Sequence, residues 1–539
     1  MNKLPLLGDE AIAQAAIDAG LSGVYSYPGT PSTEITEYIL KSKEVKEGKV
    51  VASWTSNEKT AMEAAMGISY IGKRGMTCMK HVGLNVAADA FINSAITGAN
   101  GGLLVVSADD PSMHSSQNEQ DSRFFGNFAM IPILEPSNQQ EAYDMVHYAY
   151  DLSEKFEIPV LMRITTRLAH SRAGVIRKEL RAQNELKMPG TPNQFILLPA
   201  NARRRYKLLL GNQDAYVQES EESTFNSYID NEDKSLGIIA CGIAYNYLIE
   251  NFEDHKVPHP ILKIGQYPLP RKLIEKMYNE CDEILVLEEG YPLVEESLRG
   301  FMNNGKKVLG RLDGTIPRDG ELNPNIVAKG LNLEYFDGRE ASPQVVGRPP
   351  SLCKGCPHIY SYNALSEALT KYARGRVFSD IGCYTLGALE PFTAINTCVD
   401  MGASITMAKG AADNGLVPAV AVIGDSTFTH SGMTGLLDAI LSKSPITVMI
   451  LDNETTAMTG GQNSNAHGKI EDICMGLGVD EDHIHIMDPV QKFHDENMDI
   501  IKKELDYKGV SVIIPRRECI QTIASRIRAE KNKAKPAIQ

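Results

Sequence analysis

The sequence has 539 residues, with 54 Lys and Arg against 68 Asp and Glu, and a formal net charge of −14. At roughly 100–200 residues per domain, this length predicts three or four domains, each able to bury a core without disulfides or structural metals. The acidic balance argues against nucleic acid as a partner, because nucleic-acid affinity depends on neutralising phosphates with Lys and Arg.

The sequence also bears on compartment. Residues 1–5 lack the charged-then-apolar layout of a signal peptide. We find no stretch of about 18 uninterrupted apolar residues. Nine cysteines, an odd number scattered over a long chain, fit a reducing environment better than a disulfide scaffold. We therefore expect a cytoplasmic protein with no membrane span.

Short, β-branched apolar runs alternate with helical patterns along most of the chain. The predicted strands, in chain order, cover residues 23–26, 50–54, 102–107, 159–164, 236–240, 283–288, 418–423 and 446–452. Continuous apolar strands are buried on both faces, which is typical of parallel sheets covered by helices. The predicted class is α/β, with three parallel-sheet domains.

Two changes in composition mark the predicted domain boundaries. Residues 176–234 are largely polar and charged, and residues 337–350 are rich in Gly and Pro. We therefore predict a first domain at 1–180, a linker with some helix at 181–234, a second domain at 235–335 and a third at 350–530.

The clearest chemical pattern lies in the last of these domains. One apolar strand leads into Gly424, Asp425 and Ser426, and the next leads into Asp452 and Asn453. Open α/β sheets bind ligands at the carboxyl ends of their strands. Carboxylate, amide and carbonyl oxygens are ligands that Mg²⁺ prefers, and Gly424 would let the backbone approach a diphosphate. Each segment alone is also typical of a simple turn, but the pair favours a metal–diphosphate site.

The N-terminal domain carries a second group of polar residues. Tyr-Pro-Gly-Thr30-Pro-Ser follows the first predicted strand, and Glu58 stands at the start of an Ala- and Gly-rich helix after the second. A carboxylate at a helix N-terminus is stabilised by the helix dipole, which alone accounts for Glu58.

The Gly-Asp followed by Asn resembles the thiamine-diphosphate signature, with Ser426 where most families have Gly. Together with further motifs, the sequence resembles the alpha subunits of indolepyruvate:ferredoxin oxidoreductases, of the thiamine-diphosphate-dependent 2-oxoacid oxidoreductase superfamily. The motifs are Tyr-Pro-Gly-Thr-Pro-Ser-Thr-Glu (27–34), Ser-Asn-Glu-Lys (56–59), Lys-His-Val-Gly-Leu-Asn (80–85), Cys-Lys-Gly-Cys-Pro-His (353–358), Ser-Asp-Ile-Gly-Cys-Tyr (379–384), Met-Gly-Ala-Ser (401–404) and Gly-Asp-Ser-Thr (424–427).

The resemblance implies two thiamine-diphosphate-binding folds, for the pyrimidine and the diphosphate, and a transketolase C-terminal-like domain between them. It also implies oxidative decarboxylation of an arylpyruvate with CoA, giving an acyl-CoA, CO2 and low-potential electrons. The implied partners are a beta- or gamma-type second subunit and an electron carrier, in a hetero-oligomer containing two copies of this chain.

The resemblance also implies roles for individual residues. Glu58 would hydrogen-bond N1′ of the aminopyrimidine and promote loss of the thiazolium C2 proton. Asp425 and Asn453 would hold Mg²⁺ through their side chains and Thr455 through its carbonyl. The predicted cofactor-binding residues are Cys356, His358, Gly382, Cys383, Gly402, Ser404, Gly424, Asp425, Ser426 and Asn453. The predicted substrate-binding residues are Thr30, His81, Asn85, His114 and Arg123, although a structural role fits the last four equally well.

The sequence departs from the family in its cysteines. Members usually end in a ferredoxin-like segment with two C-x₂-C-x₂-C-x₃-C-P runs, whereas Cys519 is the one cysteine after residue 480. Cys353 and Cys356 form only a pair by sequence, too few for a cluster. Lining the thiamine pocket is the favoured role for this pair, and a zinc site with His358 and a distant cysteine is the alternative. We therefore expect the iron–sulfur clusters on a partner, a separate electron-transfer subunit or ferredoxin, and not on this chain. A different electron acceptor, a non-oxidative lyase that releases an aldehyde, and a silent structural subunit remain alternatives.

Overall fold

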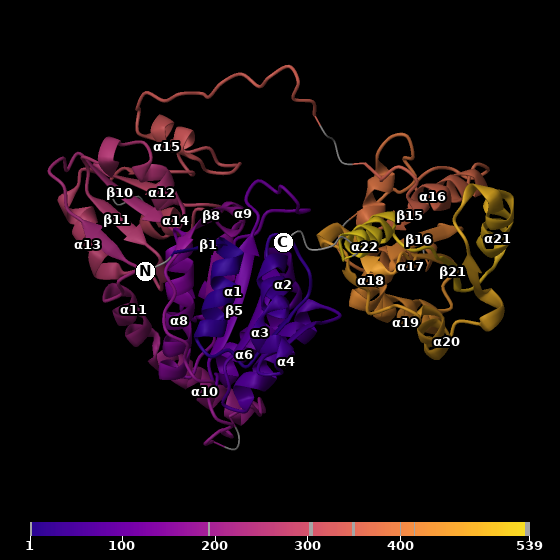
Figure 1. Cartoon of the computed structure of the whole chain (residues 1–539), viewed down its shortest axis with the longest axis horizontal. Helices are drawn as coiled ribbons and strands as arrows, with labels where there is room; N and C mark the ends of the chain where they lie inside the picture. Colours follow the sequence, from indigo (N-terminus) through magenta and orange to yellow (C-terminus); the bar gives the residue numbers. More distant parts are fainter. Residues whose placement is uncertain are drawn as a thin grey trace. The chain divides into compact units, whose positions relative to one another are not determined.

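The computed structural model describes residues 3–191, 194–300, 306–347, 351–398, 400–413 and 415–533. The chain divides into two compact units (Figure 1). Unit 1 comprises Met1–Glu340 and unit 2 comprises Ala341–Gln539.

The first sheet of unit 1 has seven strands in the order β12-β6-β7-β5-β4-β2-β3. Its strands are β2 (Gly23–Ser26), β3 (Val51–Trp54), β4 (Gly75–Lys80), β5 (Leu103–Asp109), β6 (Ile133–Leu134), β7 (Val160–Thr165) and β12 (Gln266–Tyr267). All neighbours are parallel except β12, which runs antiparallel to β6. The carboxyl ends of β2, β3, β4 and β5 therefore share one edge of the sheet.

Helices cover both faces of this sheet. They are α1 (Gly8–Asp18), α2 (Thr33–Lys41), α3 (Lys43–Lys46), α4 (Glu58–Tyr70), α5 (His81–Val86), α6 (Ala88–Thr97), α7 (Ser122–Ala129), α8 (Gln139–Phe156) and α9 (Thr166–His170). A small antiparallel sheet pairs β1 (Leu4–Leu7) with β8 (Arg172–Val175). It joins the start of the chain to the segment after α9.

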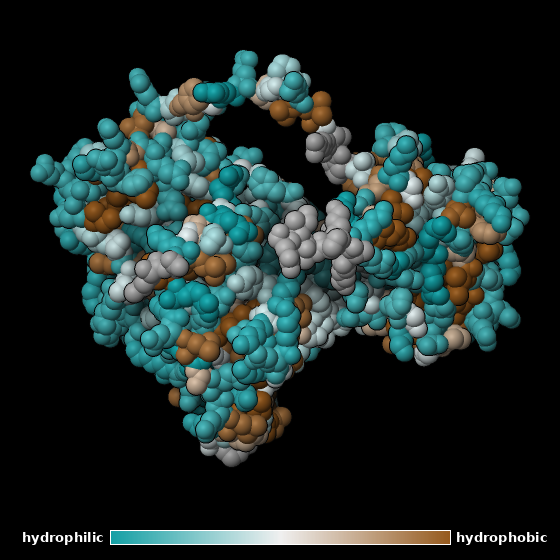
Figure 2. All heavy atoms as spheres, viewed as in Figure 1, coloured by the Kyte–Doolittle hydropathy of each residue, from teal (hydrophilic) through white to brown (hydrophobic). Residues whose placement is uncertain are grey.

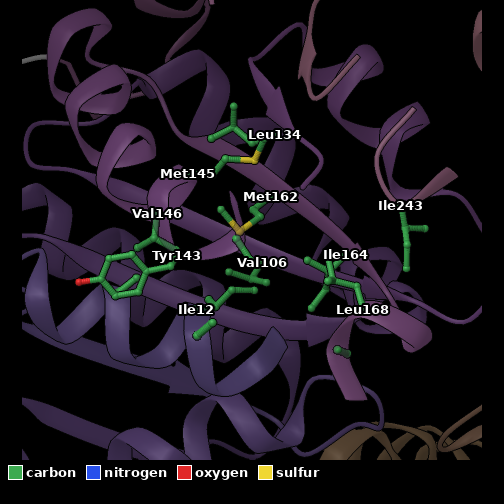
Figure 3. Close-up of a cluster of buried hydrophobic side chains, with 14 of the residues drawn as sticks. Ile12, Val106, Leu134, Tyr143, Met145, Val146, Met162, Ile164, Leu168 and Ile243 are labelled. Atoms are coloured by element: carbon green, nitrogen blue, oxygen red, sulfur yellow. The ribbon is translucent and has the colours of Figure 1, made fainter. Parts of the chain in front are cut away.

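One face of the sheet packs on α1 and α8 through a continuous apolar core. Ile12 of α1, Val106 of β5, Met162 of β7 and Tyr143 of α8 converge in it (Figure 3). These strands carry apolar residues on both faces because helices cover both, as the continuous apolar runs of the sequence predict.

The second sheet of unit 1 has the order β14-β13-β10-β11-β9. Its strands are β9 (Ser227–Ile229), β10 (Leu236–Cys241), β11 (Ile261–Ile264), β13 (Glu283–Leu287) and β14 (Val308–Leu309). Only the edge strand β9 is antiparallel among these described pairs. The accompanying helices are α10 (Pro199–Gly211), α11 (Gln213–Glu221), α12 (Ala244–Ile249), α13 (Arg271–Glu280), α14 (Leu293–Arg299) and α15 (Pro324–Gly330). Within its described residues, the segment 181–234 thus contains two helices and β9, one of the two edge strands of this sheet.

The two sheets of unit 1 share their cores. Ile238 of β10 belongs to the same cluster of buried residues as Val106. Strand β12 follows β11 in sequence yet pairs with β6 of the first sheet. The unit is therefore held together by both apolar packing and strand pairing.

Unit 2 has a parallel sheet of order β15-β16-β17-β21-β20. Its strands are β15 (Val377–Ser379), β16 (Ala419–Gly424), β17 (Ile446–Leu451), β20 (Ile484–Met487) and β21 (Ser511–Pro515). Its α-helices are α16 (Pro357–Ala368), α17 (Ala403–Asp413), α18 (Asp425–Thr427), α19 (Met433–Ser442), α20 (Ile470–Leu477), α21 (His494–Asp506) and α22 (Ile520–Lys533). A short hairpin pairs β18 (Thr455–Thr456) with β19 (Gln462–Asn463).

The predicted α/β class, with mostly parallel sheets, is confirmed. Every strand predicted from the sequence is present within one or two residues at each end. On the face drawn in Figure 2, hydrophilic residues predominate and apolar residues form scattered small groups. Among the described residues, no helix combines the length and apolarity needed to cross a bilayer.

Candidate functional site

The shared edge of β2–β5 in unit 1 gathers most of the residues predicted there. Thr30 follows β2, Glu58 begins the helix after β3, and His81 begins the helix after β4. His114 lies in the loop after β5. The parallel pairing places these loops side by side, as the sequence predicts for a ligand-binding edge.

Glu58 is held at the first position of α4. Asn57 caps this helix, its side chain accepting a hydrogen bond from the Thr60 amide at 2.8 Å. The Glu58 side chain is buried, with 5% of the residue exposed. It contacts Gly83 of α5 so closely that a Cβ there would lie 2.6 Å from Glu58 Oε1. A larger residue at this position would therefore require the Glu58 side chain to move.

Lys80 and His81 add two buried basic groups at the same edge. Lys80 Nζ donates to the Ser115 carbonyl at 2.6 Å. Burial lowers the pKa of Lys80 to about 8, although Asp110 opposes the shift. Burial lowers the pKa of His81 to about 4, so its ring is neutral at pH 7. Neither ring nitrogen of His81 has a hydrogen-bond partner among the described residues, which leaves a buried polar group to be satisfied.

The Thr30 loop passes close to Lys80. A Cβ on Gly29 would lie 3.3 Å from the Lys80 Cβ. The peptide bond between Thr30 and Pro31 is cis. Both the amide and the hydroxyl of Ser32 donate to the Gly29 carbonyl at 2.8 Å, which fixes the turn into α2.

The other predicted substrate residues are placed differently. Asn85 is exposed on α5. The His114 side chain is 51% exposed and lies 3.3 Å from Glu321 Oε2. Arg123 is fully buried in α7. Its guanidinium binds the carboxylates of Asp121 and Glu288 and the carbonyls of residues 289 and 291. A substrate carboxylate would have to displace these groups, so Arg123 has a structural role linking α7 to the second sheet.

In unit 2, the pairing of β16 with β17 brings the predicted metal ligands together. Gly424 is in register with Leu451, so Asp425 and Asp452 leave adjacent strands side by side. Asp425 is 2% exposed, and its Oδ2 has no hydrogen-bond partner among the described residues. Burial and then Asp452 raise the pKa of Asp425 to about 7. Asp452 itself is paired with Arg516 at 2.6 Å.

Asn453 and Thr455 supply the remaining predicted ligands. Glu454 between them has a φ of 63°, which turns the chain sharply after the strand. The Thr455 amide donates to Asn453 Oδ1 at 3.3 Å. Thr456 donates to the Ser426 hydroxyl at 3.0 Å, tying this turn to the one after β16. An unpartnered carboxylate oxygen beside an amide and a carbonyl fits the all-oxygen ligand set of Mg²⁺.

Two of the three glycines predicted to line the cofactor, Gly382 and Gly424, pack on Tyr384, whereas Gly402 packs on Ser431. A Cβ on Gly382 would lie 2.2 Å from the Tyr384 ring, and one on Gly424 would lie 2.6 Å from it. The Tyr384 hydroxyl donates to Asp380, which also accepts from the amides of Gly402 and Ser404 at 3.2 Å. Gly424 therefore makes room for Tyr384, a role that the sequence did not reveal.

Three cysteines of unit 2 raise the pKa of a fourth, Cys383, although the sequence pairs only Cys353 with Cys356. Burial raises the pKa of the Cys383 thiol to about 12, with Cys519, Cys356 and Cys353 adding to the shift. Burial likewise raises the pKa of Cys356 to about 11. Gln521 Nε2 donates to Cys353 Sγ at 3.4 Å, and the Cys519 amide donates to the Asn453 carbonyl at 3.2 Å. Among the described residues, no three of these thiols lie within 4.8 Å of one another, so they do not form a metal site as they stand.

His358, also predicted to bind cofactor, lies in the first turn of α16. It is 3% exposed, and burial lowers its pKa to about 4. Its ring meets Tyr384 edge-on, with 6.4 Å between centroids. Neither ring nitrogen has a hydrogen-bond partner among the described residues.

Two known protein families match the two parts of the chain that carry these groups of residues. A family described as pyruvate flavodoxin/ferredoxin oxidoreductase, thiamine diphosphate-binding, matches residues 14–220, and the C-terminal thiamine pyrophosphate-binding domain family matches residues 380–514. The indolepyruvate oxidoreductase subunit IorA of Archaeoglobus fulgidus is 38% identical over 96% of this chain and 86% of its own length. That of Pyrococcus horikoshii is 38% identical over 98% and 87%.

This chain belongs to the IorA family of indolepyruvate oxidoreductase subunits. It is thus a subunit of a thiamine-diphosphate-dependent 2-oxoacid oxidoreductase, as the sequence predicts. The 2-oxoglutarate synthase subunit KorA of Methanothermobacter thermautotrophicus is 29% identical over 35% of the chain and 52% of its own length. A 2-oxoglutarate:ferredoxin oxidoreductase from Magnetococcus marinus shares the fold, with a TM-score of 0.51 and 16% identity, covering 61% of this chain and 65% of its own.

Proposed function

We propose that this IorA-family chain is the thiamine-diphosphate-binding subunit of a complex that oxidatively decarboxylates an arylpyruvate-type 2-oxo acid. The second substrate is CoA, and the products are an acyl-CoA, CO2 and two low-potential electrons. When bound, thiamine diphosphate supplies the carbon nucleophile and the electron sink for this reaction.

The observation that carries the proposal is the position of Glu58. Its carboxylate is buried at the edge where the loops after β2, β3, β4 and β5 meet, and Gly83 leaves it space. A buried carboxylate fixed by a helix start can hold a proton at N1′ of an aminopyrimidine, which is the role proposed for Glu58.

We assign the diphosphate and Mg²⁺ to unit 2. Asp425, Asn453 and the Thr455 carbonyl would hold the ion, with Ser426 beside it. The unpartnered Oδ2 of Asp425 supports this assignment, because a buried carboxylate oxygen needs a cation or a donor. The remaining proposed cofactor contacts are Cys356, His358, Gly382, Cys383, Gly402, Ser404 and Gly424.

The substrate carboxylate would bind at the edge formed by Thr30, Lys80 and His81. Lys80 is mostly charged at pH 7 and supplies an ammonium group. His81 is neutral and can donate or accept one hydrogen bond. The indolepyruvate of the relatives' names supports an aromatic substituent on the 2-oxo acid. Asn85 and His114 stay predicted contacts, and Arg123 is left out because its donors are already engaged.

The electrons would pass to an iron–sulfur carrier, a partner subunit or ferredoxin. The oxidoreductase names of the relatives favour the oxidative reaction over the alternative, a lyase that releases an aldehyde. The proposed assembly is a cytoplasmic hetero-oligomer with a beta- or gamma-type subunit and two copies of this chain.

Product analysis distinguishes the two reactions. The complex, isolated without oxygen from its own host, is incubated with phenylpyruvate or indolepyruvate, CoA, thiamine diphosphate, Mg²⁺ and an oxidised viologen dye that accepts the two electrons. We expect the arylacetyl-CoA and CO2 in equal amounts. Arylacetaldehyde and CO2 without a thioester would support the lyase instead.

A further inference from the structure

Three side chains from separate helices of unit 1 meet away from the residues assigned above. They are Asp9 in the first turn of α1, Glu34 in the first turn of α2 and His170 at the end of α9. Helix α1 contacts both α2 and α9. One carboxylate oxygen of Asp9, one of Glu34 and one ring nitrogen of His170 all lie within 4.8 Å of one another.

The buried carboxylate of this group, that of Asp9, lies where its charge would need a partner. Asp9 is 0% exposed. Neither of its carboxylate oxygens, nor Oε2 of Glu34, has a hydrogen-bond partner among the described residues. Within the same residues, no Lys or Arg forms an ion pair with Asp9 or Glu34. Burying a carboxylate without a partner costs several kcal/mol or more, so a proton or a cation must compensate it.

We propose that Asp9, Glu34 and His170 form a binding site for a divalent transition-metal ion of the Zn²⁺ class. Two carboxylates and one imidazole are ligands that such ions take in proteins, with a fourth position left for water. Ligand atoms around such an ion lie about 3.4 Å apart, and His170 Nε2 is already 3.7 Å from Glu34 Oε2.

The site is open on one side. The side chains of His170 and Glu34 are 37% and 40% exposed, whereas Asp9 is enclosed. An ion can therefore enter from solvent and reach the buried carboxylate, with Glu34 and His170 closing on it by rotation about their side-chain torsions. The ion would link α1, α2 and α9, which Figure 1 labels as separate elements of unit 1. It would thereby anchor α2, the helix that follows the Thr30 loop.

A proton on the Asp9 carboxylate is the alternative to a bound metal ion. Burial and then Glu34 raise the pKa of Asp9 well above its ordinary value. A protonated Asp9 would donate to the neighbouring Glu34 carboxylate, which is why Glu34 also contributes to the raised pKa. The convergence of three ligand atoms, one of them from His170, is what a cation requires, and a Co²⁺ titration distinguishes the two solutions.

The test is a Co²⁺ titration of the full chain after chelator treatment, without thiamine diphosphate. Co²⁺ replaces Zn²⁺ in such sites, and its absorption spectrum separates thiolate ligands from nitrogen and oxygen ligands. We expect the wild type to bind one more Co²⁺ per chain than His170→Gln or Glu34→Gln. The additional ion should lack thiolate bands and should raise the thermal midpoint.

The matched control is His259→Gln. His259 also pairs with a carboxylate of unit 1, Asp233 at 3.4 Å, but has no third ligand beside it among the described residues. This variant should keep the full Co²⁺ stoichiometry. Since His170 and Glu34 are partly exposed, their Gln variants should fold, which a wild-type circular dichroism spectrum would verify. If the wild type and His170→Gln bound the same number of Co²⁺ ions per chain, the proposal would be overturned. Asp9, Glu34 and His170 would then be a group of side chains that share a proton.

Discussion

The Glu58 carboxylate lies directly against Gly83, so that a Cβ on Gly83 would fall 2.6 Å from Oε1 and 2.7 Å from Cγ. The two residues belong to different helices, α4 and α5, that begin at the carboxyl ends of β3 and β4. The sequence motif around Lys80 and His81 is therefore linked physically to the proposed proton-holding group.

This contact predicts the effect of Gly83→Ala. The added methyl cannot fit unless the Glu58 side chain moves, so turnover should fall at least tenfold, because a displacement of about 1 Å at a catalytic group has effects of that order or larger. The measurement is kcat of the reconstituted complex. Gly67→Ala in α4 is the control, because nothing lies within 4 Å of a Cβ there; a Gly83→Ala variant as active as this control would contradict the contact.

Glu58→Gln tests the proton-holding role itself. The amide preserves shape but cannot take up a proton, so we expect thiamine diphosphate to bind within a few-fold of wild type and turnover to fall by about 10²–10⁴. Glu63→Gln on the exposed side of the same helix should be fully active. Substantial activity in Glu58→Gln would rule out the assigned role.

Asp425→Asn tests the metal–diphosphate assignment. Removing the one carboxylate of the proposed Mg²⁺ ligand set should weaken Mg²⁺-dependent binding of thiamine diphosphate at least tenfold. Isothermal titration with and without Mg²⁺ measures this effect. Asp438→Asn, at an exposed position of α19, should bind like wild type, and unchanged affinity in Asp425→Asn would place the ion elsewhere.

A substitution of Arg123 distinguishes a structural role of this residue from a role in substrate binding. Arg123→Met removes the guanidinium that pairs with the buried Asp121 and Glu288 carboxylates, which should cost about 3–5 kcal/mol of stability. Arg167→Met removes an exposed pair with Glu321 and should cost about 1 kcal/mol or less. Thermal and urea midpoints compare the two variants. If Arg123→Met instead kept its stability and raised KM for the 2-oxo acid, Arg123 would bind substrate after all.

Glu289 gives unit 1 a specific pH dependence. Burial raises its pKa to about 7, so in the folded protein it stays protonated over a range in which the unfolded chain has already ionised. Its contribution to stability is present below pH 4.5 and is lost as the pH rises through about 7. Glu289→Gln, which mimics the neutral acid, should lose less stability than wild type between pH 5 and pH 8. Thermal midpoints at these two pH values measure the difference, and parallel losses would contradict the assignment.

The sequence predicts the strands well because each is a continuous apolar run, and such runs are buried wherever the sheet lies. It also predicts that Asp425 and Asn453 share a sheet edge, since both follow strands directly. Both predictions depend on local pattern alone, and the pairing of β16 with β17 agrees with them.

What the sequence did not predict depends on contacts between distant segments. Cys519 influences the pKa of Cys356 and of Cys383 only because the segment after β21 returns beside the turn after β17. The burial of Arg123 depends on the loop between β13 and α14. Likewise, Asp9, Glu34 and His170 meet only through helix packing.

The most direct test of the proposed function is viologen-dye reduction by the complex isolated without oxygen, with an arylpyruvate, in the presence and absence of CoA. We predict CoA-dependent dye reduction, with two electrons per CO2 released, that requires thiamine diphosphate. Release of CO2 without dye reduction would contradict the oxidative reaction.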